Sequence, residues 1–105
     1  MVDFGAHSSY FPDGIMEVGA HIVVKGYVQG VGFRFYVYRA ASSLHVLGTV
    51  ENSPNGDVRI VAEGDRSLIE ELIKAVKIGP RSAKVNDVAV RWTEPQHKFQ
   101  EFTIL

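Results

Sequence analysis

A glycine-rich turn that ends in an arginine is the feature of this sequence best suited to chemistry. Residues 24–34 read VKGYVQGVGFR, a pattern that predicts a strand, a turn at Gly30 and Gly32, and the first turn of a helix at Arg34. Glycines let consecutive backbone N–H groups converge on one point, and a helix N-terminus adds partial positive charge there. A cation at that end opposes the helix dipole by roughly 0.3–1 kcal/mol unless an anion lies between them. The segment therefore predicts a phosphate-binding loop with Arg34 beside it.

A second candidate residue is Asn52, which ends a predicted strand just before the turn Ser53-Pro54-Asn55-Gly56. An asparagine in this place more often bonds to local backbone groups than to water. Its amide cannot accept a proton as a general base, but it can hold a water molecule by donating and accepting hydrogen bonds. Asn52 therefore gains a chemical role only together with Arg34.

The periodicity of the apolar residues predicts the elements that position these two side chains. Alternation predicts strands, and repeats of three and four residues predict helices. The Asn-Gly step at Asn55 and Gly56 predicts a hairpin, and Ser67 with Glu70 predicts a capping box at the second helix. The alternation slips near Asn86, which suggests a β-bulge. In order, the pattern predicts a strand at 21–28, a helix from 33 to about 47, strands at 49–52 and 57–63, a helix from 67 to 78, a strand at 83–92 and a final strand at 99–105.

This order predicts an α+β fold of the ferredoxin-like β-α-β-β-α-β type, in which two β-α-β units pack together. We expect an antiparallel sheet with both helices on one face and a short extra C-terminal strand at an edge. The opposite face should be partly solvated, because polar residues alternate with the apolar ones. These polar residues are His21, Lys25, Arg59 and Glu63.

Length and composition limit the classes of function. The 105 residues are enough for one domain, which we place at 21–105, after a flexible N-terminal extension at 1–20. The net charge of −1, with 11 basic and 12 acidic residues interspersed, disfavours nucleic acid as a partner. The chain has no cysteine, no apolar run that could span a membrane and no metal-ligand spacing among its four histidines. We therefore expect a cytoplasmic monomer that uses no metal or other cofactor.

The sequence resembles the acylphosphatases, a family of small ferredoxin-like enzymes. The similarity covers nearly all residues after Ala20, and every defined position of the family's first signature is present at 24–34. The second signature is represented by Gly48-Thr49-Val50-Glu51-Asn52, followed by Gly56, Val58 and Gly64.

This resemblance implies hydrolysis of the carboxyl–phosphate bond of acyl phosphates, with an acyl phosphate as substrate, inorganic phosphate or a similar anion in the site, and no metal. It implies that Arg34 binds the substrate and that Asn52 positions the attacking water. The phosphate-binding loop would consist of Gln29, Gly30, Val31, Gly32 and Phe33.

The chain departs from the second signature at two positions. The family usually has an aromatic residue where Thr49 stands and a basic or neutral residue where Glu51 stands. Because side chains alternate along a strand, both should point away from the side of Asn52. Rate and substrate preference are the properties that these departures affect.

Two other functions compete with this interpretation. Residues 30–35 faintly resemble the aromatic motif of RNA-binding ferredoxin-like domains, but that motif lies on a strand, where bases can stack, and here a helix is predicted. Acylphosphatase-like regions also occur as accessory domains of larger carbamoyl-transfer maturation proteins. The short chain and its lack of a cysteine cluster favour an independent enzyme.

Overall fold

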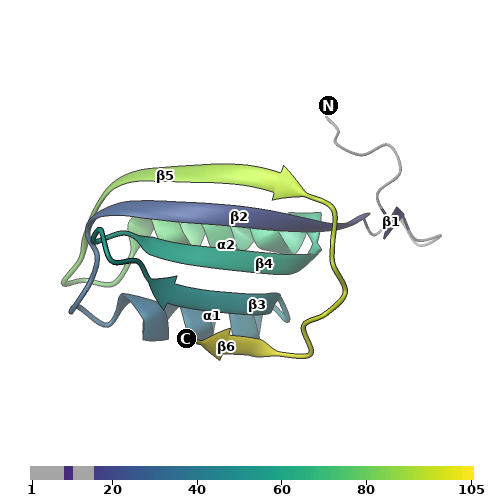
Figure 1. Cartoon of the computed structure of the whole chain (residues 1–105), viewed down its shortest axis with the longest axis horizontal. Helices are drawn as coiled ribbons and strands as arrows, with labels where there is room; N and C mark the ends of the chain where they lie inside the picture. The colour runs from purple at the N-terminus through teal and green to yellow at the C-terminus, as the bar shows by residue number, and fades with distance from the viewer. Residues whose placement is uncertain (1–8, 11–15) are drawn as a thin grey trace.

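The computed structural model describes residues 9–10 and 16–105 of the chain. Within these residues, two helices and six strands follow one another in the predicted order, with one short strand added at the start (Figure 1). The elements are β1 (Ser9–Tyr10), β2 (Met16–Tyr27), α1 (Phe33–Ser43), β3 (Leu47–Asn52), β4 (Val58–Asp65), α2 (Arg66–Ile78), β5 (Lys84–Thr93) and β6 (Phe102–Ile104).

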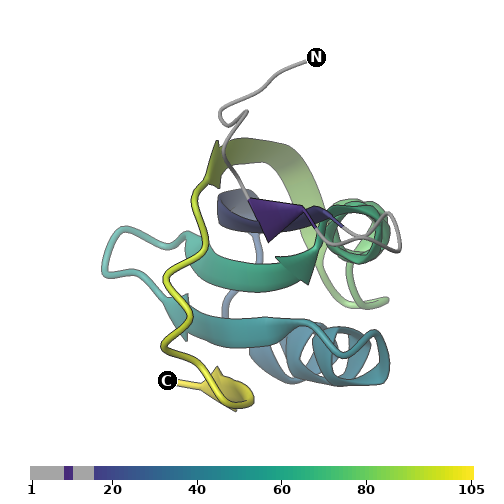
Figure 2. The ribbon, with the colours of Figure 1, turned by 90° about the vertical axis from the view of Figure 1, so that its right-hand side faces the viewer.

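The strands of the described residues form one sheet, in which β2 is an inner strand. It pairs antiparallel with β4 on one side and with β5 on the other, and β1 pairs with its first residues. β3 pairs antiparallel with β4, and β6 adds parallel to β3 at the edge. Both helices cover the same face of the sheet (Figure 2). The ferredoxin-like prediction is confirmed, with the qualification that the C-terminal edge pair is parallel.

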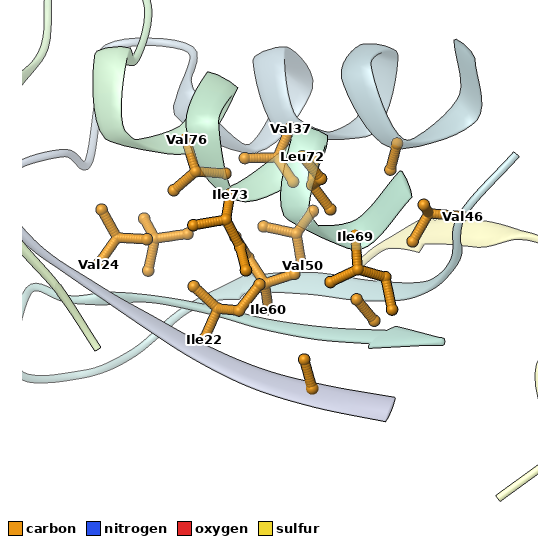
Figure 3. Packing of buried hydrophobic residues seen from close by; sticks show 14 of the residues in the cluster. Ile22, Val24, Val37, Val46, Val50, Ile60, Ile69, Leu72, Ile73 and Val76 are labelled. Carbon is orange, nitrogen blue, oxygen red and sulfur yellow. The ribbon is translucent and has the colours of Figure 1, made fainter. Parts of the chain in front are cut away.

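The core lies between the sheet and the two helices, and it consists mainly of branched aliphatic side chains (Figure 3). Alternate residues of β2, among them Ile22 and Val24, are buried beneath the helices because a strand turns every second side chain to the same face. They meet apolar residues that recur every three or four positions along α2. The α2 residues of this contact are Ile69, Leu72, Ile73 and Val76.

Two helix boundaries differ from the predictions. Helix α1 ends at Ser43, because His45 adopts a φ of 60° and turns the chain into β3. Helix α2 begins at Arg66 with Asp65 as its N-cap residue, so the capping box predicted at Ser67 is wrong. The Ser67 hydroxyl instead donates to the Asp65 carboxylate at 2.6 Å. The predicted end of this helix at residue 78 and the predicted bulge near Asn86 are both confirmed.

The first long strand begins earlier than its alternation indicated. β2 starts at Met16, so residues 16–20 belong to the sheet rather than to an extension, and Val18 and Ala20 are fully buried. Small residues such as Gly19 and Ala20 carry a weak hydrophobic signal, which hid the strand. The rest of the predicted flexible extension, residues 1–8 and 11–15, lies outside the described residues. None of the helices in the described part is long and apolar enough to cross a membrane.

The connection from β5 to β6 crosses the helix-free face of the sheet (Figure 2). A buried carboxylate holds it there, since Glu63 on β4 is only 5% exposed and accepts hydrogen bonds from the backbone N–H groups of Gln96 and His97. The distance from His97 N to Glu63 Oε1 is 3.1 Å. Glu63 thereby fixes the segment that leads into β6.

We expect Glu63→Gln to lower the free energy of unfolding by about 1–3 kcal/mol, because one of the two N–H groups would then face an amide NH₂ instead of an acceptor. Urea unfolding followed by circular dichroism measures the change. Glu51→Gln makes the same substitution at an exposed site on the neighbouring strand and should stay within about 0.5 kcal/mol of the parent. Equal stability of the two variants would contradict the anchoring role of Glu63.

Candidate anion-binding site

A hollow of about 190 Å³ lies where the loop after β2, the first turn of α1, the end of β3 and the strand β6 meet. Arg34 and Asn52, which sequence analysis singled out from distant segments, both line it. The lining residues are Val28, Gly30, Gly32, Phe33, Arg34, Phe35, Asn52 and Ile104. The fold therefore brings the predicted cation and the predicted amide together at one site.

The loop and the first turn of α1 contain backbone N–H groups beside this hollow. Gly30 and Gly32 adopt φ values of 74° and 79°, a left-handed conformation that favours glycine, and a Cβ at either position would meet no atom within 4 Å. Gly32 is the N-cap residue of α1, and neither a side-chain cap nor an acidic residue occupies the first turn. The first helical bond runs from Tyr36 N to Gly32 O, so the N–H groups of the preceding helical residues have no intrahelical acceptor. These groups can receive an anion.

Arg34 is half-buried at the edge of the hollow and is held by the last residue of the chain as given. Its Nη1 donates to the carbonyl oxygen of Leu105 at 2.9 Å. A guanidinium has five N–H donors in a planar fork, so this bond leaves others for a ligand. The contact orients the Arg34 side chain and leaves most of its N–H donors free.

Asn52 lies at the end of β3, is half-buried and lines the hollow. Within residues 9–10 and 16–105, its carboxamide has no hydrogen-bond partner in the protein. Val50 is buried in the core two residues earlier, whereas Glu51 is exposed. The alternation predicted for this strand is therefore confirmed, and Thr49 and Glu51 point away from the hollow.

Gln29 holds the loop rather than lining the hollow. Its Nε2 donates to the carbonyl oxygens of Ser53 and Asp57 at 2.7 and 2.8 Å, across the turn that joins β3 to β4. Val31 is likewise absent from the lining. Of the five predicted loop residues, Gly30, Gly32 and Phe33 contact the hollow, and Gln29 ties the loop to the β3–β4 turn.

The same turn is held by a buried carboxylate. Lys25 Nζ donates to Asp57 Oδ2 at 2.7 Å, and the Asn55 amide donates to the same oxygen at 3.2 Å. The hydrogen bond from Lys25 holds the pKa of Asp57 below its usual range; burial acts against this shift, and the charges of Lys25 and Arg59 reinforce it. Asp57 is therefore ionised under neutral conditions and links β2 to the turn.

Sequence reasoning missed three lining residues, Val28, Phe35 and Ile104, and also the contact from Leu105. Phe35 follows Arg34 in the first turn of α1, so its position could have been inferred from the helix prediction alone. Ile104 and Leu105 reach the site only because β6 pairs parallel with β3, with Val50 opposite Ile104. No local pattern in the sequence specifies that pairing.

The described residues contain no group of three or more His, Asp or Glu side chains placed to hold a metal ion.

The position of Phe33 disfavours the RNA-binding alternative. Phe33 is 1% exposed and begins a helix, so it cannot offer a stacking surface on a strand.

Comparison with known proteins finds one family over most of the chain. The family model described as acylphosphatase matches residues 20–104. A protein named acylphosphatase from Caldanaerobacter subterraneus subsp. tengcongensis is 44% identical over 89 residues, which cover 85% of this chain and 99% of that relative.

Solved structures show the same architecture. The crystal structure of acylphosphatase from Bacillus subtilis superposes with a TM-score of 0.81 at 35% identity, covering 84% of this chain and 98% of that one. A crystal structure of full-length HypF in the phosphate- and nucleotide-bound form has a TM-score of 0.78 at 28% identity. It covers 90% of this chain but only 12% of that much longer protein, so the same fold also occurs as a small part of a larger chain.

We expect Lys25→Met to lower stability at neutral pH, because the Asp57 carboxylate loses its main hydrogen-bond donor. A carboxyl group whose pKa is depressed in the folded state stabilises the fold above its unfolded pKa of about 4, and this contribution is lost as pH falls through the folded pKa. The difference between parent and variant should therefore shrink on acidification. Urea unfolding between neutral and acidic pH measures it, with Lys74→Met, which removes an exposed pair with Glu71, as control. A difference that stays constant with pH would contradict the assignment.

Proposed function

This chain belongs to the acylphosphatase family and is an enzyme that hydrolyses acyl phosphates, and we propose that the hollow beside α1 is where it cleaves the carboxyl–phosphate bond. The products are a carboxylate and inorganic phosphate. The observation that carries this proposal is the convergence of the glycine loop, Arg34 and Asn52 on one hollow of about 190 Å³, a size that suits a phosphoryl group rather than a whole metabolite.

In this proposal the phosphoryl group binds at the N-terminus of α1. The unpaired N–H groups of the loop and of the first helical turn donate to its oxygens, and the partial positive charge of the helix end adds to them. Arg34 donates through the guanidinium N–H groups that its bond to Leu105 leaves free. These groups are fixed before the substrate arrives, so they need little reorganisation as charge shifts onto the equatorial oxygens of phosphorus.

Asn52 then positions the attacking water. The water forms a new P–O bond in line with the bond between phosphorus and the acyl oxygen. That second bond breaks, and the acyl group leaves with its electron pair as a carboxylate. The carboxamide cannot accept the proton of the water, and no carboxylate or imidazole of the described residues lines the hollow. We therefore assign that proton to an oxygen of the substrate's own phosphoryl group. A carboxylate leaving group needs no acid.

The remaining expectations concern partners and location. We propose that phosphate or a similar anion occupies the hollow in the absence of substrate, and that the protein acts as a cytoplasmic monomer. In this mechanism Arg34 and the helix end provide the positive charge, so we expect activity without added metal. Hydrolysis of benzoyl phosphate in metal-free buffer tests the proposed activity, and an inactive parent protein would contradict it.

We expect Asn52→Ala to lower kcat by about 10²- to 10³-fold while phosphate still binds, because the variant loses the group that aims the water but keeps the anion donors. Benzoyl phosphate turnover gives kcat, and competition by inorganic phosphate gives the affinity. Asn86→Ala, at an exposed site on β5, is the matched control and should retain full activity. Unchanged turnover in Asn52→Ala would remove its proposed role.

We expect Arg34→Ala to weaken phosphate binding and to lower kcat together, since the guanidinium contacts the phosphoryl group in both the ground and the transition state. Arg34→Lys should recover little, because one ammonium group cannot reproduce the planar fork. The same two assays apply, with Arg81→Ala, an exposed arginine, as control. A lysine variant with parental kcat/KM would show that charge alone suffices.

A further inference from the structure

A second hollow, of about 540 Å³, runs along α1 and shares two lining residues with the phosphate-binding hollow. Gly32 and Phe35 line both, whereas Asn52 and Ile104 line only the smaller one. The further lining residues of the larger hollow, called here the α1 groove, are Tyr36, Arg39, Ala40, Ser43 and Pro80.

The position of the α1 groove fits the leaving group of the proposed reaction. In-line displacement places the attacking water and the acyl oxygen on opposite sides of phosphorus. Asn52, to which the proposed function assigns the water, ends strand β3, whereas the two residues that both hollows share, Gly32 and Phe35, lie at the start of α1. An acyl group bound to the phosphoryl oxygen therefore has a path along α1.

Two side chains give this groove a chemical character. Phe35 is 56% exposed, and its ring stacks on Tyr38 with centroids 6.2 Å apart. Arg39 lies one turn further along α1, with its guanidinium carbon 5.7 Å from the centre of the Phe35 ring. Residues at i and i+4 are neighbours on a helix surface, about 6 Å apart along the axis. The groove thus offers an aromatic face followed by a cation.

Arg39 forms no salt bridge with another residue that the structure describes. Helix α1 has two arginines and no acidic residue over its whole length. Tyr36 is fixed at the inner side of the groove, because its hydroxyl donates to the Ala75 carbonyl of α2 at 2.7 Å.

We propose that the α1 groove binds the acyl group of the substrate and that Arg39 selects acyl phosphates with a second anionic group at the far end of a flat or aromatic acyl chain. This inference rests on the proposed function and adds a substrate class to it. The phosphoryl group occupies the smaller hollow, the acyl chain lies on Phe35, and the distal carboxylate reaches the Arg39 guanidinium. Arg39 is a specificity residue and takes no part in the bond-breaking step.

The test compares two substrates that differ only in charge, 4-carboxybenzoyl phosphate and its neutral analogue 4-carbamoylbenzoyl phosphate. The ratio of their kcat/KM values, charged over neutral substrate, is measured for the parent protein and for each variant. Because every protein is tested with the same two compounds, differences in their intrinsic reactivity cancel when the ratios are compared. For an exposed cation we expect Arg39→Gln to lower this ratio about three- to fivefold, mainly through KM, and Arg39→Lys to retain part of it. Added salt should lower the ratio of the parent protein as well.

Arg59→Gln is the matched control, because Arg59 is exposed on the helix-free face of the sheet. The kcat/KM ratio of this variant should equal that of the parent. An unchanged ratio in Arg39→Gln would overturn the proposal while hydrolysis of benzoyl phosphate still supported the function. A ratio lowered equally by Arg59→Gln would also overturn it, since the effect would then come from net charge. A parent protein inactive on benzoyl phosphate would overturn both the function and the subsite.

Discussion

The geometry of the site depends on the two hydrogen bonds that Gln29 donates to the carbonyl oxygens of Ser53 and Asp57. The glycine loop follows β2 and Asn52 ends β3, but these strands are not neighbours, because β4 lies between them. The loop must therefore be held against the turn that leads from β3 into β4. Gln29 makes that link directly, and the pair of Lys25 with Asp57 makes a second link from β2 to the same turn.

This arrangement explains which parts of the site were predictable. Arg34 and the glycines were evident because a phosphate-binding loop needs φ > 0 and a helix N-terminus, both of which leave local sequence patterns. Gln29 belonged to the same motif, but its side chain acts on a turn far away in the sequence, and local patterns do not show such contacts. The fold was predictable because the periodicity of apolar residues is also a local pattern. The helix boundaries at His45 and Asp65 were not, since they depend on backbone conformations that composition does not fix.

Helix α1 carries a charge distribution that folding alone would not favour. It places Arg34 in its first turn, without an acidic residue to complement the dipole there, at a cost of roughly 0.3–1 kcal/mol. The carbonyl of Leu105 offsets part of this cost by accepting from the guanidinium. The edge strand β6 therefore completes the site as well as the sheet, and Glu63 supports it from a distance by fixing the segment that precedes it.

In the proposed mechanism, the roles of the groups that line the hollow follow from what substrate and product share. Inorganic phosphate presents the same oxygens to the loop and to Arg34 as the substrate does, so the ground-state part of these contacts stabilises the product complex equally. Only interactions that strengthen in the transition state raise kcat. The proposal leaves two such sources, namely donors that would meet the equatorial oxygens as the phosphoryl group flattens, and the amide of Asn52, to which we assign the alignment of the water. Because the anion donors bind substrate and product alike, the proposed rate enhancement depends largely on the alignment of the water. The residue to which we assign that alignment, Asn52, lies at the end of β3.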